Sequence, residues 1–240
     1  NVKSFISICS NLFNEIPEPY WKINDCYYDK TFTINGDLTD VYCFWTNTAN
    51  YRIRMQKILE CINYMDVANT ISKLYHTKDW CLVNYDNSKP TTIVDMKSPL
   101  LDDTQISNPA YLKKHLIITG PNAGGKTTYV KNIVLNIILA QTLGIAMGNK
   151  MSTKLYNIIQ TFMRVQDIVG NRSYFETEVK YCYELLQKAE QNRSSNILFV
   201  MDEPMHSTPP IEGQSTAYAV CEYINNNYKN ATIIVTTHYK

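Results

Sequence analysis

Hydrophobic residues at helical spacing dominate the first third of the chain. They recur at intervals of three and four from Val2 to Ile16 and stop before Pro17, which predicts an amphipathic helix. A second, longer helix is predicted further on. Its hydrophobic face consists of Met55, Ile58, Leu59, Ile62, Met65, Ala68, Ile71 and Tyr75. Between about residues 17 and 50 the pattern is irregular and predicts no element.

The pattern changes after residue 78, where hydrophobic strands begin to alternate with helices. Strands are expected at 80–85, 92–96, 116–119, 197–201 and 232–236, and helices from the loop after residue 119 to about Met147, at 175–193 and at 214–226. This alternation predicts an α/β fold with a mixed, largely parallel sheet between helices. We therefore expect a helical piece over residues 1–78, with no firm assignment for 1–54, followed by an α/β domain over residues 79–240.

Composition narrows the class of protein. The net charge of +1 gives no basic footprint for nucleic acid, so DNA contacts would need a local patch or other segments. The seven cysteines include no C-x-x-C pair, which favours free thiols in a reducing, intracellular compartment, the cytoplasm or the nucleus. Because the chain begins at Asn1 rather than Met and stops at Lys240 directly after a strand-like run, we expect both ends to be cut.

A phosphate-binding pattern, GPNAGGKT, occupies residues 120–127 between a predicted strand and a predicted helix. Its glycines let the backbone curl so that consecutive N–H groups face a phosphate, and the helix adds the positive end of its dipole. Lys126 can reach the β- and γ-phosphates, and the hydroxyl of Thr127 can ligate Mg²⁺. The pattern therefore predicts a nucleotide-binding loop rather than an ordinary glycine turn.

An acidic pair ends the hydrophobic run ILFVM at 197–201. Asp202 is suited to hold Mg²⁺ and Glu203 to activate the attacking water. Many strands end in an acidic residue, so this signal gains its weight from the phosphate loop upstream.

Two further residues stand at the ends of predicted elements. Ser173 precedes the helix at 175–193 and His238 follows the strand at 232–236. Taken alone, Ser173 is well explained as a plain helix N-cap, and a single histidine at a strand end, such as His238, is more often structural or merely exposed.

The order and spacing of these motifs resemble the MutS family of DNA mismatch-repair ATPases. The loop of that family is TGPN, a small residue or Met, GGK and two hydroxyl residues, and here it runs from Thr119 to Thr128. ISNPAYLKKH at 106–115 is similar to the segment leading into that loop, GNRSYFETEV at 170–179 to the signature segment, and TTHY at 236–239 to the switch histidine. In the signature segment Ser173 is followed by Phe175 and Glu178.

The resemblance implies an ABC-type P-loop NTPase domain that binds ATP and Mg²⁺ and works as a homodimer or a MutS-type heterodimer. It implies catalytic roles for Glu203, His238 and Ser173, the last acting on the γ-phosphate of the neighbouring subunit, and metal ligation by Thr127 and Asp202. The nucleotide-binding residues it implies are Gly120, Pro121, Asn122, Ala123, Gly124, Gly125, Lys126, Thr127 and Thr128. Residues 1–78 would then be a fragment of the lever helices that join the ATPase to a DNA clamp.

The segment after Glu203 departs from the family pattern. It reads PMHSTPPIEGQSTA, in which Thr208 and Gly213 keep their places, Glu212 replaces the usual Asp, and Pro209 and Pro210 are expected to stiffen a loop that crosses to the partner subunit.

Three functions remain open from the sequence. The first is an ATPase whose cycle opens and closes a dimeric DNA clamp in mismatch repair, with mismatched or branched duplex contacted mainly through segments absent from this chain. The second is a MutS-like ATPase that serves recombination or another DNA transaction without recognising mismatches. The third is a pseudo-ATPase that binds nucleotide to organise an assembly, against which the intact Lys126 and Glu203 argue.

Overall fold

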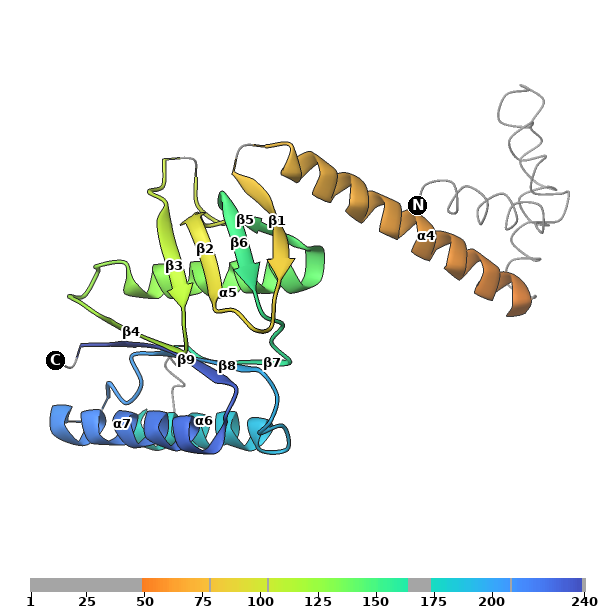
Figure 1. The fold of residues 1–240 in the computed structure, drawn as a ribbon. Helices are drawn as coiled ribbons and strands as arrows, with labels where there is room; N and C mark the ends of the chain where they lie inside the picture. The colour runs from red at the N-terminus through yellow and green to blue at the C-terminus, as the bar shows by residue number, and fades with distance from the viewer. Residues whose placement is uncertain (1–48, 78, 103, 164–173, 208, 239–240) are drawn as a thin grey trace, which may run out of the picture. The chain divides into compact units, whose positions relative to one another are not determined.

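The structure is a computed structural model that describes residues 49–77, 79–102, 104–163, 174–207 and 209–238. Contacts divide the chain into two units, Asn1–Ser72 and Lys73–Lys240. The predicted helix at 2–16 lies outside the described residues. The second predicted helix is α4, Ala49–Tyr75 (Figure 1). No described helix is long and apolar enough to cross a membrane.

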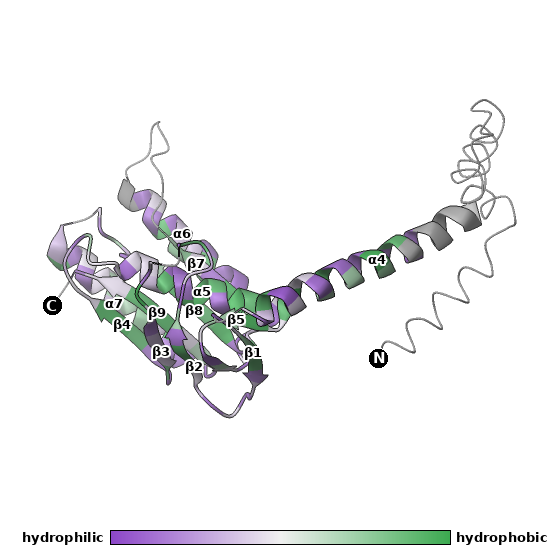
Figure 2. Cartoon of the chain, turned by 90° about the horizontal axis from the view of Figure 1, so that it is seen from above, coloured by the Kyte–Doolittle hydropathy of each residue, from purple (hydrophilic) through white to green (hydrophobic). Residues whose placement is uncertain are grey.

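Much of the described part of α4 is exposed, including several of the residues predicted to form its hydrophobic face. Leu59, Ile62 and Met65 are 50%, 53% and 52% exposed. Figure 2 shows hydrophobic and hydrophilic residues mixed along the helix. The prediction of a helix is confirmed, whereas burial of that face is not seen among the described residues.

The second unit contains two β-sheets rather than the one sheet expected (Figure 1). A four-stranded parallel sheet has the order β4-β9-β8-β7. Its strands are β4 (His115–Thr119), β7 (Ile158–Phe162), β8 (Ile197–Asp202) and β9 (Ala231–Thr237). The strands predicted at 116–119, 197–201 and 232–236 are therefore confirmed, and the parallel sheet contains all three.

The other sheet has five strands in the order β3-β2-β6-β1-β5 and is mainly antiparallel. Only β1 and β6 pair in parallel. The strands are β1 (Trp80–Tyr85), β2 (Thr91–Met96), β3 (Asn108–Leu112), β5 (Ile145–Met147) and β6 (Lys150–Thr153). The runs at 80–85 and 92–96 were predicted as strands, and the remaining three strands were not.

Three helices complete the described part of the unit: α5 (Lys126–Leu143), α6 (Tyr174–Glu190) and α7 (Pro210–Asn227). All three differ in length from the prediction, and α6 ends at Glu190 rather than near 193. The helix after the phosphate loop was expected to reach Met147 but ends at Leu143, because Gly144 adopts a left-handed conformation with φ 73° and its N–H bonds to the carbonyl of Ala140. α7 begins at Pro210 rather than near 214, since proline is tolerated in the first turn of a helix.

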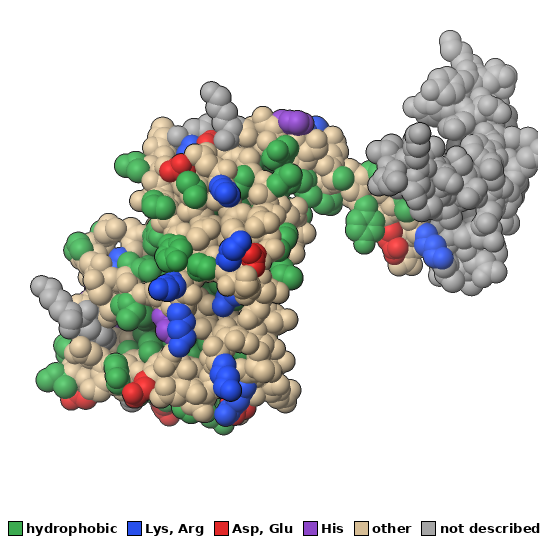
Figure 3. Space-filling view, viewed as in Figure 1, with side chains coloured by type: hydrophobic (Ala, Val, Ile, Leu, Met, Phe, Trp, Pro, Cys, Tyr) green, Lys and Arg blue, Asp and Glu red, His purple; other side chains and the backbone are tan. Residues whose placement is uncertain are grey.

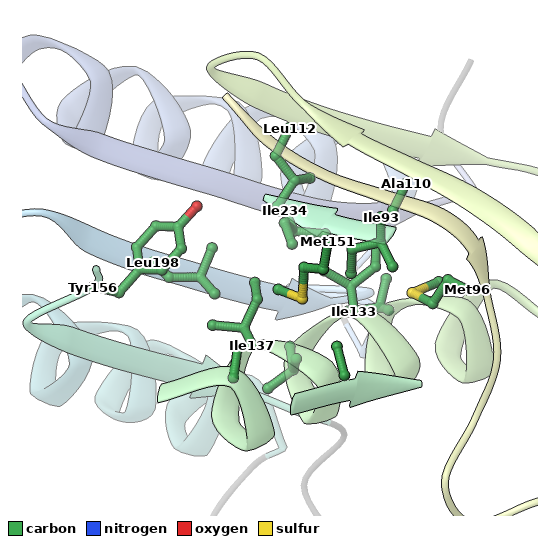
Figure 4. Packing of buried hydrophobic residues seen from close by; sticks show 14 of the residues in the cluster. Ile93, Met96, Ala110, Leu112, Ile133, Ile137, Met151, Tyr156, Leu198 and Ile234 are labelled. Atoms are coloured by element: carbon green, nitrogen blue, oxygen red, sulfur yellow. The ribbon is translucent and has the colours of Figure 1, made fainter. Parts of the chain in front are cut away.

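Alternating side chains let the parallel sheet contribute to two cores. Leu198 and Val200 of β8 face a cluster that also contains Ile133 and Ile137 of α5 (Figure 4). Phe199, between them, faces a second cluster built with α6 and α7. Successive strand residues point to opposite faces, so β8 and β9 are buried on both sides, as their uninterrupted hydrophobic runs predicted. The first core joins α5 to strands of both sheets.

Candidate active site

The carboxyl ends of three neighbouring strands position the predicted site. β9 lies between β4 and β8 in the parallel sheet. The phosphate loop follows β4, His238 follows β9, and Glu203 follows β8. Parallel strands end at the same edge of a sheet, so segments more than a hundred residues apart in sequence meet there.

The phosphate loop turns sharply between β4 and α5. Gly125, the residue before α5, is left-handed with φ 81°, and Ala123 has φ 59° although it carries a side chain. The N–H of Gly124 donates to the carbonyl of Pro121 at 3.3 Å. Left-handed residues in such a turn direct successive N–H groups toward a common point, which is the geometry of an anion-binding concavity. A non-glycine residue held at positive φ is uncommon and concentrates at functional sites.

Lys126, the first residue of α5, folds back over this loop. The residue as a whole is 8% exposed. Its ammonium donates to the carbonyls of Gly120 at 2.9 Å and Pro121 at 3.0 Å. It also lies 3.3 Å from Nδ1 of His238 and 3.5 Å from Oε1 of Glu203. One cation therefore connects the loop with the residues that follow β8 and β9.

Oxygen atoms suited to Mg²⁺ lie beside the loop. The hydroxyl of Thr127 donates to both oxygens of Asp202, at 2.8 and 3.1 Å. The carboxylate belongs to a residue that is 4% exposed. A hydroxyl and a carboxylate are hard oxygen ligands, and Mg²⁺ in NTPases is held by one or two such groups together with phosphate oxygens and water. The two side chains therefore fit the predicted metal.

Glu203 stands at the centre of the charged groups. Its Oε1 lies 2.6 Å from Nε2 of His238 and 3.5 Å from Nζ of Lys126. Burial raises the pKa of this carboxyl, but the hydrogen bond and charge of His238 and the charge of Lys126 outweigh burial and lower the pKa below its usual value. At neutral pH the group is a carboxylate that can accept a proton.

The backbone of Glu203 is also constrained. Its φ is 51°, and its N–H donates to the carbonyl of Thr236 at 3.2 Å and to the hydroxyl of Thr236 at 3.0 Å. The same hydroxyl donates to Asp202 at 2.6 Å. Thr236 is fully buried, so it fixes Asp202 and Glu203 relative to each other.

The structure brings together most of the residues predicted to form the site. The contacts described above involve Gly120, Pro121, Lys126, Thr127, Asp202, Glu203 and His238. Asn122, Ala123, Gly124 and Gly125 complete the loop, and Thr128 lies in the first turn of α5. Ser173 and Thr208 lie outside the described residues.

Sequence reasoning missed Thr236. Its signal was a polar residue near the end of the hydrophobic run TIIVTT, where every residue up to Thr236 is buried. A hydroxyl buried in such a strand needs hydrogen-bond partners. Here the partners are the carboxylate of Asp202 and the N–H of Glu203, at the end of the neighbouring strand β8.

Comparison with known proteins gives this arrangement a family. The model of MutS domain V matches residues 116–240. The DNA mismatch repair protein MutS of Petrotoga mobilis is 29% identical over 221 residues, which cover 88% of this chain and 26% of that protein. MutS of Halothermothrix orenii is 28% identical over 198 residues, which cover 78% of this chain and 21% of that protein. The DNA mismatch repair protein MSH3 of Vanderwaltozyma polyspora is 25% identical over 229 residues, which cover 90% of this chain and 22% of that protein.

This chain thus spans about a fifth to a quarter of the length of these curated relatives. The match to domain V begins within β4 and includes the phosphate loop, the acidic pair and His238. Because that match covers more than half of the chain, the protein belongs to the MutS family.

Proposed function

We propose that this chain binds ATP with Mg²⁺ and hydrolyses it to ADP and phosphate. The observation that carries the proposal is the position of Glu203, which touches His238 and Lys126 beside the phosphate loop and follows directly after Asp202. A phosphate cradle, a cation, a pair of metal ligands and a base are the parts that phosphoryl transfer to water requires.

Each residue has a defined task in this proposal. The loop N–H groups and Lys126 bind the β- and γ-phosphates, and Lys126 exchanges its bonds to the carbonyls of Gly120 and Pro121 for phosphate oxygens. Thr127 and Asp202 hold Mg²⁺, which neutralises charge on the phosphates when bound.

Glu203 takes a proton from the attacking water while the oxygen of that water bonds to the γ-phosphorus. At the same time the bond between the γ-phosphorus and the bridging oxygen of ADP breaks. The contact between Nε2 of His238 and Oε1 of Glu203 keeps the carboxylate of Glu203 oriented.

We further propose that two copies of the chain, or this chain and a related subunit, share each site. The support is the resemblance of the segment around Ser173 to the family signature, and the position of this serine directly before α6. The N–H groups and dipole at the start of a helix favour an anion such as the γ-phosphate of a neighbouring subunit. The ATP cycle would then open and close a dimer around DNA, inside the cell, in the cytoplasm or nucleus.

A second candidate role differs in the DNA that is recognised. The segment after Glu203 departs from the family pattern at Pro209, Pro210 and Glu212, which favours a divergent MutS-like ATPase acting in recombination or another DNA transaction. Binding of the full-length protein to mismatched, branched and plain duplexes, compared at one fixed salt concentration, separates the two roles.

The first prediction tests hydrolysis. Glu203→Gln removes the base while leaving the phosphate loop intact, so ATP affinity should change little and turnover should fall by about 100-fold or more. Lys126→Ala should weaken binding of the triphosphate itself. Affinity is measured by calorimetry and turnover by phosphate release, with the exposed Glu222→Gln of α7 as a matched control. Unchanged turnover in Glu203→Gln would remove Glu203 from the mechanism.

The second prediction tests the shared site. Ser173→Arg should block ATP-dependent closure of the dimer but leave nucleotide binding to a single subunit in place. Mixed with Lys126→Ala, it should regain about a quarter of the parent activity, because half of the dimers would be mixed and each would hold one complete site. If Ser173→Arg hydrolyses ATP normally as a strict monomer, the sites are not shared.

A further inference from the structure

A carboxylate outside the nucleotide site is buried against the loop that follows Glu203. Glu178 lies in the second turn of α6, and its side chain is 5% exposed. A buried carboxylate is costly unless hydrogen bonds or a cation compensate it. Its surroundings therefore have to provide donors.

The donors for Glu178 come from two consecutive loop residues. Nδ1 of His206 lies 2.9 Å from Oε1, the hydroxyl of Ser207 donates to Oε2, and the N–H of Ser207 donates to Oε2 at 3.4 Å. A carboxylate only accepts hydrogen bonds, so Nδ1 of His206 is the protonated nitrogen of this contact. Both oxygens of Glu178 are thus engaged by the segment between β8 and α7.

That segment has an unusual backbone. Glu203 and Met205 both have positive φ, 51° and 62°, which side chains other than glycine rarely adopt. Such a conformation persists only where the surroundings enforce it. Here Thr236 of β9 binds the N–H of Glu203 at one end, and Glu178 of α6 binds Ser207 at the other.

Met205, between those ends, is 1% exposed and belongs to the same buried cluster as Cys182 and Leu185 of α6. The loop is consequently fixed to α6 both by packing and by the hydrogen bonds of Glu178.

We propose that Glu178 is a positioning residue that holds the Glu203 loop in its catalytic conformation and makes the general base sensitive to the position of α6. This inference rests on the hydrolytic role proposed above for Glu203. α6 directly follows Ser173, the residue proposed to reach the γ-phosphate in the neighbouring subunit. A displacement of α6 by that subunit would pull on His206 and Ser207 and thereby turn Glu203.

The test separates catalysis from binding. Glu178→Gln should lower kcat by about 10-fold, as misplacement of a reacting group does, while the Kd for ATP stays within about twofold of the parent. Glu184→Gln is the matched control, because it makes the same change on α6 at an exposed ion pair with Lys180. Its kcat should equal that of the parent.

Variants of the loop test the same contact without disturbing the core, since the side chain of His206 is 38% exposed. In His206→Asn the amide nitrogen replaces Nδ1, so kcat should be retained, whereas His206→Leu should match the loss in Glu178→Gln. Ser207→Thr should likewise retain activity that Ser207→Ala loses. Combining His206→Leu with Glu178→Gln should cost no more than Glu178→Gln alone, because that change already breaks the contact with His206.

Hydrogen exchange gives a readout that needs no hydrolysis. The amides of Met205 to Ser207 should exchange faster in Glu178→Gln than in Glu184→Gln. If the parent chain hydrolyses ATP and Glu178→Gln keeps both the parent kcat and the parent exchange, Glu178 does not position the loop. A parent without hydrolysis refutes the proposed function, and with it the proposed effect of Glu178 on kcat. Equal loss in His206→Asn and His206→Leu would also overturn the inference.

Discussion

Three polar residues, Thr127, Asp202 and Thr236, share hydrogen bonds at the carboxyl edge of the parallel sheet. The carboxylate of Asp202 accepts from both hydroxyls, at 2.8 Å from Thr127 and 2.6 Å from Thr236. Hydrogen bonds to a buried charge are stronger than those between neutral groups, and leaving one unmade carries a desolvation cost. The order of the site consequently depends on Thr236, a residue with no chemical task of its own.

Thr236→Val tests this dependence, because valine keeps the shape of threonine and removes the hydroxyl. We expect the free energy of unfolding to fall by about 1–3 kcal/mol, since Asp202 loses a donor and the N–H of Glu203 loses an acceptor. Urea denaturation measures the change. Thr161→Val, at an exposed position of β7, should change stability by less than about 0.5 kcal/mol. Equal denaturation midpoints for the two variants would contradict the role of Thr236.

At the scale of elements, the sequence predicts what short-range patterns determine. The run ILFVMD became β8 because uninterrupted hydrophobic residues suit a strand covered on both faces. The phosphate loop was recognisable because its glycines and Lys126 are local requirements of phosphate binding. Prediction was incomplete where the local structure is determined by residues that are distant in the sequence.

The end of α5 illustrates that limit. Ile145–Met147 continues the hydrophobic pattern of the helix, yet it forms β5 by antiparallel pairing with Trp80, Cys81 and Leu82. The local signal that ends the helix is Gly144 alone. β3 was missed for the same reason, since it is defined by pairing with β2. In the site, Thr236 and the contact between Glu178 and His206 depend on neighbours in space that no local pattern reveals.

Gly144→Ala tests the stop signal of α5. The left-handed conformation at φ 73° disfavours any side chain, so we expect a loss of about 1–2 kcal/mol in the free energy of unfolding. The added Cβ would lie 4.0 Å from the hydroxyl of Tyr85, an ordinary contact, so the cost comes from the backbone. Thr142→Ala, in the last turn of the same helix, should be neutral or stabilising because alanine favours helix. A Gly144→Ala protein as stable as the parent would show that the glycine conformation is not required.

At the scale of the molecule, the numbers of basic and acidic residues nearly balance. The net charge is +1, and Figure 3 shows Lys and Arg side chains spread over the drawn face among uncharged atoms. Affinity for DNA grows with the number of phosphates that basic residues neutralise, and sequence or mismatch reading needs base contacts or a wedge that bends the duplex. The features described in the second unit belong to packing and to the proposed nucleotide site.

We therefore predict that the 240-residue chain alone does not distinguish a mismatched from a matched duplex. Binding to both should be weak, equal and steeply dependent on salt, because it would rest on phosphate contacts. Fluorescence titrations of the two duplexes at physiological salt measure this, with the matched duplex of the same length as the reference. A tenfold or greater preference for the mismatch would contradict the prediction. A preference of that size is comparable with the roughly 1–3 kcal/mol that a single base-pair change commonly costs in specific binding. It would mean that the segment 17–50, with Trp21, Tyr27, Tyr28 and Trp45, holds a DNA-reading surface.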